Sequence, residues 1–460
     1  MIDRIGRRAK ALLLCASVAL APAMGCAESL ADAFVKTYRA SPQLEQQRLL
    51  QRTLDEDVAV ALSALRPTVA GQAAISRNLV RNFPNNTAAT LQLVLDYTLL
   101  DGGQRRMRLG AAKEAVLSGR YQLIQSEQNL LLQAADAYFG LQLAQRNVSL
   151  RESNLRLLTE QLRAARDRFE VGEVTRTDVT IAEARLAAAQ SLLANARGQV
   201  DIQREAYRAV TGTLPQGPLE PPPPLPQLPP TVERAQALAL QVHPLILSGQ
   251  HDIAAATLLA SAAEAERLPT IGLQGSIGAS RAAQGEPSAN LGIQSNVPIY
   301  NGGRLSALNR RAIANAQASR AALEQQARLI ANGVGQAYAL LEIARAQILA
   351  SQQQVRSAQL AFEGFREEAA LGARTTLDVL DAEQELLDAR TSALNAEIDA
   401  QIAVYQVLAA IGLMTTEHLG LTVERYDPSD YYNLVADAPA VSPSSQGGRL
   451  DRVLRRFGRD

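Results

Sequence analysis

The stretch VGEVTRTDV, residues 171–179, decides the fold, because it returns 200 positions later as LGARTTLDV, residues 371–379. Both copies carry glycine, then threonine three residues on, then aspartate three residues after that. The same offset relates Asp101-Gly102-Gly103 to Asn301-Gly302-Gly303 further upstream. Recurrence at a fixed offset indicates that one structural unit has been duplicated.

We predict the two repeats at residues 28–213 and 231–435, with a proline-rich strap between them at 214–230. Proline at this density favours extended polyproline II backbone, which makes a stiff spacer. A ligand for a proline-binding domain is the alternative. The secretory signal peptide predicted below at residues 1–27 indicates an exported chain, which makes the spacer the better interpretation. The tail at 436–460 is rich in proline, serine, glycine and arginine, which predicts disorder.

Each repeat is predicted to contain one long helix, at 103–172 and 303–372, because neither stretch contains proline. Apolar residues in the first stretch recur every seven positions, the spacing of coiled-coil packing. They are Leu117, Ile124, Leu131 and Tyr138, followed by Leu141, Val148, Leu155, Leu162 and Phe169. Return helices are predicted at 175–210 and 375–411, so that each repeat ends in an antiparallel helical hairpin.

The tips of the two hairpins are specified by local chemistry. Gly172 and Gly372 suit the left-handed conformation that ends a helix. Thr175 and Thr375, each with an aspartate three residues later, predict capping boxes that start the return helices.

A β-hairpin is predicted before each long helix, at 67–100 and 269–300, where apolar and polar residues alternate. The alternation is cleanest in Leu91, Leu93, Leu95, Tyr97 and Leu99 against Gln92, Val94, Asp96 and Thr98. Each strand is about ten residues long, the length of a tilted membrane strand. A soluble antiparallel sheet with one wet face shows the same alternation, but strand length and the apolar outer residues favour the membrane.

Four strands do not close a barrel, since about eight are the minimum. The barrel must then be shared: two chains supply eight strands and a filled interior, and three supply twelve with room for a channel. Beyond the N-terminal segment no run of about 18 apolar residues occurs, so no transmembrane helix is predicted. A chain of this kind that enters a membrane must therefore do so through strands.

The N-terminal segment, residues 1–27, is predicted to be a secretory signal peptide, because basic residues precede an apolar stretch and small residues follow it. Cleavage after Ala27 removes Cys15 and Cys26, which are the two cysteines of the chain, so the mature protein has no disulfide. The alternative is a lipid attached to Cys26, although Ala23-Met24-Gly25 makes a poor lipoprotein box.

Charge and composition exclude several classes of protein. The chain has 46 basic and 46 acidic residues, whereas binding to nucleic acid needs a clustered basic excess. Tryptophan is absent and aromatic residues make up 4%, which suits thin helical packing. His243, His251 and His418 lack metal-ligand spacing, and no zinc-protease, nucleophile-elbow or phosphate-loop motif occurs. We predict no enzyme, no cofactor and no metal.

Residues 28–432 resemble the TolC family of outer-membrane channel proteins. The resemblance rests on the duplication, on the two glycine pairs at 102–103 and 302–303, and above all on LGARTTLDVLDAEQELLDAR at 371–390. It implies a mixed α+β membrane protein and a homotrimer. Four strands per chain would contribute to a shared twelve-stranded barrel in the outer membrane of a Gram-negative bacterium, continued by a coiled-coil helical tunnel in the periplasm. A periplasmic adaptor and an inner-membrane transporter of ABC type would dock at its inner tip.

The resemblance also implies functional residues at the inner tip. Asp378 and Asp381 would form aspartate rings that favour cations, and Arg374 with Asp178 would belong to the gate. Ala369 stands where the family usually has tyrosine, so one gate link is absent. Capping alone also accounts for Asp178 and Asp378, and Asp381 has the alternative of being a solvated helix carboxylate.

The function implied is a passive exit duct of a tripartite export system. The C-terminal stretch ERYDPSDYYNL, residues 424–434, is similar to the ending of members that serve type I protein secretion. Drug or small-molecule efflux is the alternative. A more distant alternative is an exported coiled-coil structural protein, which would not need four alternating strands.

Overall fold

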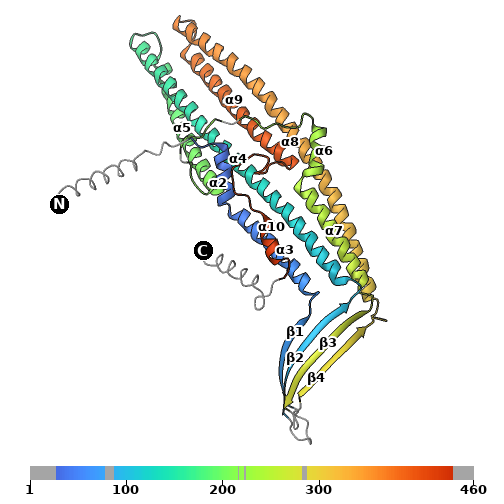
Figure 1. Cartoon of the computed structure of the whole chain (residues 1–460). Helices are drawn as coiled ribbons and strands as arrows, with labels where there is room; N and C mark the ends of the chain where they lie inside the picture. The colour runs from blue at the N-terminus through green and yellow to red at the C-terminus, as the bar shows by residue number, and fades with distance from the viewer. Residues whose placement is uncertain (1–26, 78–86, 216, 222–223, 282–286, 439–460) are drawn as a thin grey trace, which may run out of the picture. The chain divides into compact units, whose positions relative to one another are not determined.

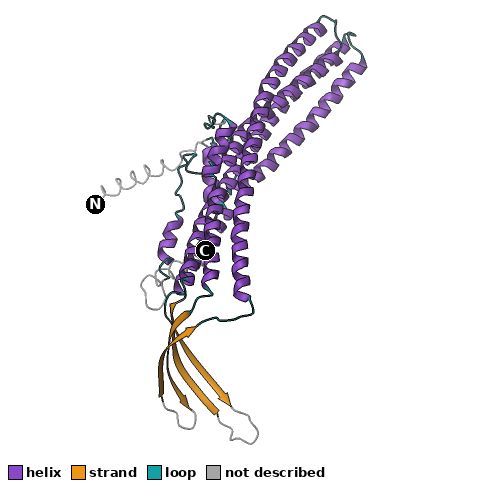
Figure 2. Ribbon diagram, turned by 90° about the vertical axis from the view of Figure 1, so that its right-hand side faces the viewer, coloured by secondary structure: helices purple, strands orange, loops and turns teal. Residues whose placement is uncertain are grey.

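The computed structural model describes residues 27–77, 87–215, 217–221, 224–281 and 287–438. The predicted signal peptide, apart from Ala27, and the predicted tail beyond Ala438 lie outside the described residues. Figure 1 shows the elements along the chain, and Figure 2 distinguishes helices from strands. In chain order they are α2 (Leu30–Ala40), α3 (Pro42–Ser63), β1 (Thr68–Arg77), β2 (Thr87–Leu100), α4 (Gln104–Glu170), α5 (Arg176–Thr211), α6 (Val232–Val242), α7 (Pro244–Ala265), β3 (Thr270–Arg281), β4 (Pro287–Asn296), α8 (Arg304–Ala370), α9 (Thr376–Ile411) and α10 (Pro428–Val435).

The longest helices are α4 and α8, each a continuous stretch of 67 residues. Both cover the proline-free segments, and each leads through a short turn into a 36-residue return helix, α5 or α9. Within the described residues, no helix has both the length and the apolar character needed to cross a membrane. Helix α10 was not anticipated from the sequence. It starts at an Asp427 cap, where the carboxylate accepts the amide N–H of Ser429 at 2.8 Å.

The four strands form one antiparallel sheet in the order β1-β2-β3-β4. Its register places the apolar residues of neighbouring strands opposite one another, as in the pairs Val69↔Leu95, Leu93↔Ile277 and Leu273↔Ile293. Glutamines meet on the other face, where Nε2 of Gln92 donates to Oε1 of Gln72 at 2.7 Å. The sheet therefore has one apolar and one polar face, as the alternation predicted.

Strand β4 is shorter than predicted. It ends at Asn296, whereas the predicted hairpin continued to residue 300. Pro298 has no backbone N–H to donate to a further ladder bond, which explains the early end. Beyond the strand, Ile299 and Tyr300 are 94% and 89% exposed.

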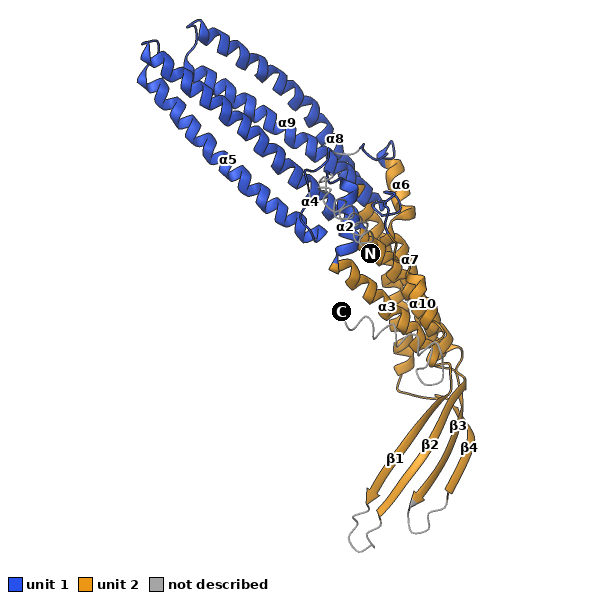
Figure 3. Cartoon of the chain, turned by 60° about the vertical axis from the view of Figure 1, so that its left-hand side comes forward, with its two compact units in different colours: residues 1–41, 128–232, 335–423 blue, residues 42–127, 233–334, 424–460 orange. Residues whose placement is uncertain are grey.

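The chain divides into two compact units (Figure 3). Unit 1 comprises residues 1–41, 128–232 and 335–423, and unit 2 comprises residues 42–127, 233–334 and 424–460. Each unit takes segments from both sequence repeats, because α4 and α8 each contribute residues to both units. The duplicated segment of sequence and the unit of packing are thus different divisions of the chain.

The core of unit 1 joins distant parts of the sequence around Tyr138 of α4. Its hydroxyl oxygen lies 3.1 Å from the carbonyl oxygen of Glu28 and 2.9 Å from that of Glu220. Glu28 also forms a parallel β-bridge with Leu219, and its carboxylate accepts from Nζ of Lys36 at 2.7 Å. The strap is therefore tied to the start of the described chain, and its described residues contain no helix.

Candidate functional site

The two hairpin tips have the same local structure, and both belong to unit 1. Gly172 and Gly372 adopt φ angles of 79° and 76°, in the left-handed region that glycine occupies without steric cost. Thr175 and Thr375 are the N-caps of α5 and α9, and a complete capping box is present at each. The recurring sequence therefore encodes a recurring turn.

Asp178 and Asp378 are the carboxylates of these capping boxes. Oδ2 of Asp378 accepts from the backbone N and from Oγ1 of Thr375, at 3.0 and 2.8 Å. Asp178 makes the same pair of bonds to Thr175, at 2.9 and 2.7 Å. The backbone bond and then the side-chain bond from Thr375, helped by the charge of Arg374, lower the pKa of Asp378. Asp378 is therefore an ionised carboxylate committed to a helix cap.

Arg374, expected to meet Asp178 at the gate, binds within its own hairpin. Its Nε donates to Oε2 of Glu368 at 2.8 Å, and its guanidinium carbon lies 4.4 Å from the centre of the Phe365 ring. The hydrogen bond that Arg374 donates to Glu368 is the main cause that raises the pKa of Arg374. Among the described contacts Arg374 and Asp178 therefore have separate partners, because each finds a group close in sequence.

Both tips nevertheless line one hollow of about 520 Å³ in unit 1. Glu173, Thr175 and Asp178 come from the first tip, and Gly372, Arg374 and Thr375 come from the second. The hollow thus brings residues of both tips together, with charges of both signs.

Asp381 has a partner that sequence reasoning missed. Nη2 of Arg185 on α5 donates to its Oδ1 at 2.6 Å, which links the first hairpin to the second. The two residues lie 196 positions apart. No local pattern could have found the pair, because it depends on how α5 and α9 pack.

Two further links between the hairpins were also missed. Nη1 of Arg146 on α4 donates to Oε1 of Glu397 on α9 at 2.9 Å, at exposed positions. Nδ2 of Asn154 on α4 donates to Oε1 of Glu383 on α9 at 2.8 Å, and Glu383 is buried. Helix α9 is therefore joined to both helices of the first hairpin.

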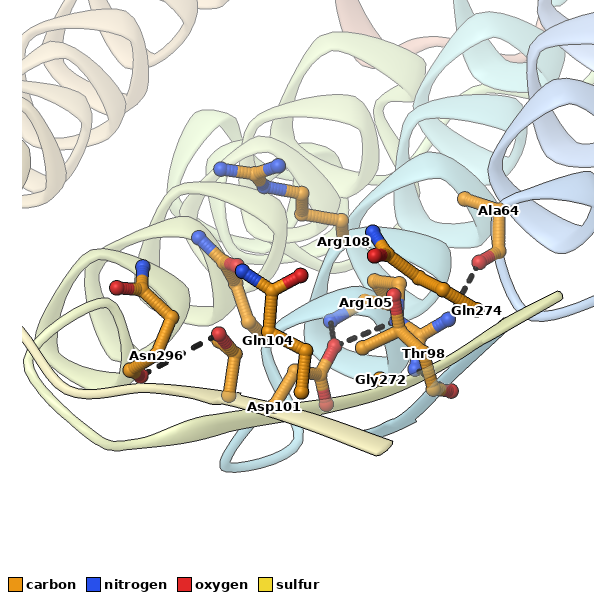
Figure 4. Close-up of a pocket in the computed structure, with 11 residues that line it drawn as sticks. Ala64, Thr98, Asp101, Gln104, Arg105, Arg108, Gly272, Gln274 and Asn296 are labelled. Carbon is orange, nitrogen blue, oxygen red and sulfur yellow. Dashed lines mark hydrogen bonds and ion pairs between the residues drawn. The ribbon is translucent and has the colours of Figure 1, made fainter. Parts of the chain in front are cut away.

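A second polar site lies in unit 2, where strands lead into helices (Figure 4). Nε of Arg105 donates to Asp101 at 2.7 Å, Nη1 to the carbonyl of Ala64 at 2.7 Å, and Nη2 to that of Thr98 at 2.6 Å. Burial raises the pKa of Asp101, but the hydrogen bonds and charge of Arg105 outweigh burial and lower it. Arg105 thus fixes the junction, whereas the corresponding position in the second repeat is Leu305.

Nothing in the described part of the chain groups three or more histidine, cysteine, aspartate or glutamate side chains as a metal site would. His243 caps α7, with Nδ1 accepting the amide N–H of Leu245 at 3.2 Å. His251 lies 2.7 Å from Glu114, and its ring stacks on Tyr121. The side chains of His243 and His251 are therefore engaged by neighbouring groups of the fold.

Comparison with known proteins gives consistent matches. The family model described as "Outer membrane efflux protein" matches residues 36–213 and 236–413, which are offset by the same 200 positions as the tips. The outer membrane efflux protein BepC of Brucella suis biovar 1 is 37% identical over 434 residues, covering 93% of this chain and 95% of BepC.

Two other matches bear on function and fold. The alkaline protease secretion protein AprF of Pseudomonas aeruginosa is 29% identical over 360 residues, covering 74% of this chain and 72% of AprF. The solved structure of the outer membrane protein VceC from Vibrio cholerae has a TM-score of 0.73 at 20% identity. It covers 83% of this chain and 96% of the VceC chain.

The family match spans more than half of the chain, so the predicted resemblance and fold class are confirmed. Members of this family are channels rather than enzymes, and they lie in the outer membrane with a helical tunnel in the periplasm. They work as trimers with an adaptor and an inner-membrane transporter. The chain belongs to the outer membrane efflux protein family, the TolC family of outer-membrane export channels.

Proposed function

We propose that three copies of this chain form the exit duct of a type I secretion system, which carries a protein such as a toxin across the outer membrane. The duct is passive. An inner-membrane transporter of ABC type would select the cargo and supply the energy, and a periplasmic adaptor would join that transporter to the hairpin tips.

The sheet supports assembly from several copies. Strands β1 and β4 are the ends of the sheet, so each has one edge without a partner among the described strands. Unpaired edges present N–H and C=O groups that must be satisfied, above all in lipid. Pairing β1 of one copy with β4 of the next satisfies them, and three copies supply twelve strands.

The observation that carries the choice of cargo is the segment at 424–434, which is similar to the ending of secretion members. In unit 2 this segment includes most of α10, which packs on α3. The guanidinium groups of Arg48 and Arg52 each lie 5.3 Å from a tyrosine ring of the segment, Tyr426 and Tyr431 respectively. The segment is therefore an integral part of the fold. AprF, named for secretion of alkaline protease, gives further support.

The second candidate function is efflux of small molecules. It is favoured by the 37% identity to BepC, which is named as an efflux protein and matches nearly the whole chain. One duct can serve both functions if different transporters recruit it, since the duct itself selects little.

A deletion strain separates the two functions. We expect the mass spectrum of its culture supernatant to lack at least one large secreted protein, and dye and antibiotic accumulation to match that of wild type. Raised accumulation with an unchanged set of secreted proteins would make the chain an efflux duct and contradict protein secretion.

Complementation provides the control. Wild-type chain supplied from a plasmid should restore the missing protein. Deletion of the ABC transporter gene that adjoins the affected cargo should reproduce the loss. If that deletion leaves secretion intact, the ABC-type partner is wrong even if the duct is right.

A further inference from the structure

A buried carboxylate joins the two helical hairpins of unit 1. Glu383 on α9 is only 2% exposed, and its Oε1 accepts from Nδ2 of Asn154 on α4. Its other oxygen, Oε2, is buried without a hydrogen-bond partner among the described residues. An ionised carboxylate in this place has one amide donor, where water would supply several.

The surroundings of Glu383 are apolar on both sides of α9. Leu380, one turn before it, packs with residues of the first hairpin, among them Leu158, Leu162, Ala182 and Ala189. Leu386, one turn after it, packs with residues of the second hairpin, among them Ala358 and Phe362. Charge at Glu383 therefore cannot be solvated while these contacts hold.

Several charged groups on the neighbouring helices have partners other than Glu383. These pairs are Arg185 of α5 with Asp381, Arg146 of α4 with Glu397, and on α8 Arg356 with Gln353 and Glu363 with Gln359. Burial raises the pKa of Glu383, and the smaller effect of the hydrogen bond from Asn154 lowers it. The net result is a pKa of about 7.

We propose that Glu383 and Asn154 form a proton-sensitive link, which holds the two hairpins of each chain together at acidic pH and loosens as Glu383 ionises. The neutral acid is tolerated in the apolar contact. The carboxylate is stabilised when α9 moves away from α4 and admits water. This link belongs to the channel whatever its cargo, so its test does not depend on protein secretion.

The direction of the effect follows from the two pKa values. The buried group titrates near 7 and the solvated group near the ordinary value of 4.5. The closed arrangement, with the hairpins in contact, binds the proton more tightly than the open one, with the hairpins apart. The ratio of closed to open therefore falls as pH rises from 4.5 through 7 and levels off by about pH 8. Between pH 5 and pH 7 the ratio should fall by a factor of roughly some tens.

Planar-bilayer recordings of the purified channel test this proposal. We expect the open fraction of wild type to rise between pH 5 and pH 7 and to level off by pH 8. Glu383→Gln has the same shape without the charge, so it should keep the low open fraction at every pH. A flat wild-type profile, or a Glu383→Gln profile that parallels wild type, would overturn the proposal.

Two control variants separate the link from other titrations. Glu397→Gln removes a carboxylate from the exposed link to Arg146 and should leave the pH profile in place. Asp55→Asn removes a buried carboxylate in unit 2, and it should likewise leave the channel profile unchanged. Loss of the pH dependence in either variant would assign the effect to a different group.

Infrared difference spectra report the proton itself. Burial also raises the pKa of Asp55 to about 6, so the spectra are taken from the Asp55→Asn protein. A protonated-carboxyl band should disappear from this protein between pH 6 and pH 8, and it should be absent from the difference when Glu383→Gln is added. Asn154→Leu removes the amide donor and should move the midpoint to higher pH. An Asp55→Asn protein with no such band at pH 6 would contradict a neutral buried Glu383.

Discussion

Arg185 on α5 and Asp381 on α9 form an ion pair at 2.6 Å that joins the two helical hairpins. Their side chains are 40% and 57% exposed, so the pair stabilises the fold by less than about 1 kcal/mol. The pair matters more for the charge of the pore than for the stability of the fold. If Asp381 contributes to an aspartate ring in the trimer, each copy of Arg185 offsets one of the ring's charges.

The first prediction concerns cation selectivity. Asp381→Asn should lower the preference of the channel for cations, and Arg185→Gln should raise it, because a ring of carboxylates selects cations. Asp378→Asn combined with Asp381→Asn should lower it further and relieve block by trivalent cations. Reversal potentials in planar bilayers under a salt gradient measure the effect. Unchanged selectivity in all three variants would show that neither aspartate contributes to the cation selectivity of the pore.

The second prediction concerns the tip turn. Gly372→Ala should destabilise the tip by about 1–2 kcal/mol, because φ of 76° brings a Cβ too close to its own backbone. The destabilisation does not come from a clash with another residue, since nothing lies within 4 Å of the added Cβ. Faster hydrogen exchange in peptides covering residues 371–375 would report it.

Gly364→Ala in α8 is the matched control. It adds the same methyl group, also with nothing within 4 Å, but at a helical position. This variant should stabilise α8 by about 0.5–1 kcal/mol. Equal destabilisation by both substitutions would refute the conformational explanation.

The third prediction concerns Arg105 in unit 2. Arg105→Leu introduces the residue that the second repeat has at this position and leaves Asp101 buried without its cation. The free energy of unfolding should fall by about 3 kcal/mol, in the range for breaking a buried ion pair. A lower melting temperature in detergent measures it. Arg108→Leu is the control, because its pair with Glu266 is 52% exposed at the arginine and should contribute far less.

Asp101 gives this junction a pH dependence. Because the pKa of Asp101 is lowered in the folded protein, its contribution is present above the ordinary value of 3.8 and is lost as pH falls through the lowered pKa. Wild type should therefore lose more stability on acidification below pH 4 than Arg105→Leu. Parallel loss in both proteins would show that Asp101 does not depend on Arg105.

The fourth prediction concerns Asp55 on α3, which is fully buried and accepts from Nε2 of Gln51 at 3.3 Å. Burial raises the pKa of Asp55 to about 6. Since this lies above the ordinary 3.8, the free energy of unfolding should fall by about 2 kcal/mol as pH rises from 4 to 7. Melting temperatures across this range should show the fall in wild type and not in Asp55→Asn. Asp57→Asn, at an exposed position on the same helix, should behave like wild type.

Much of the fold could be predicted because its signals are local. Sevenfold spacing and the absence of proline placed α4 and α8, and the Thr-x-x-Asp pattern placed the starts of α5 and α9. Alternation placed the strands, and β4 deviated where Pro298 removes a ladder donor. Helix α10 was not predicted because a stretch of eight residues is too short to show a recognisable helical periodicity.

The sequence by itself determined the duplication, the hairpins with their caps, the two faces of the sheet and the family. The hairpins, the caps and the sheet faces depend on residues within a few positions of one another, and the duplication is the recurrence of such local patterns 200 positions later. Only the tertiary structure decided which side chains meet. Glu383 meets Asn154 across 229 positions, and Arg374 turns to Glu368 rather than to Asp178. Such pairs depend on the register between packed helices, which is fixed by the sum of many weak apolar contacts and by no single local pattern.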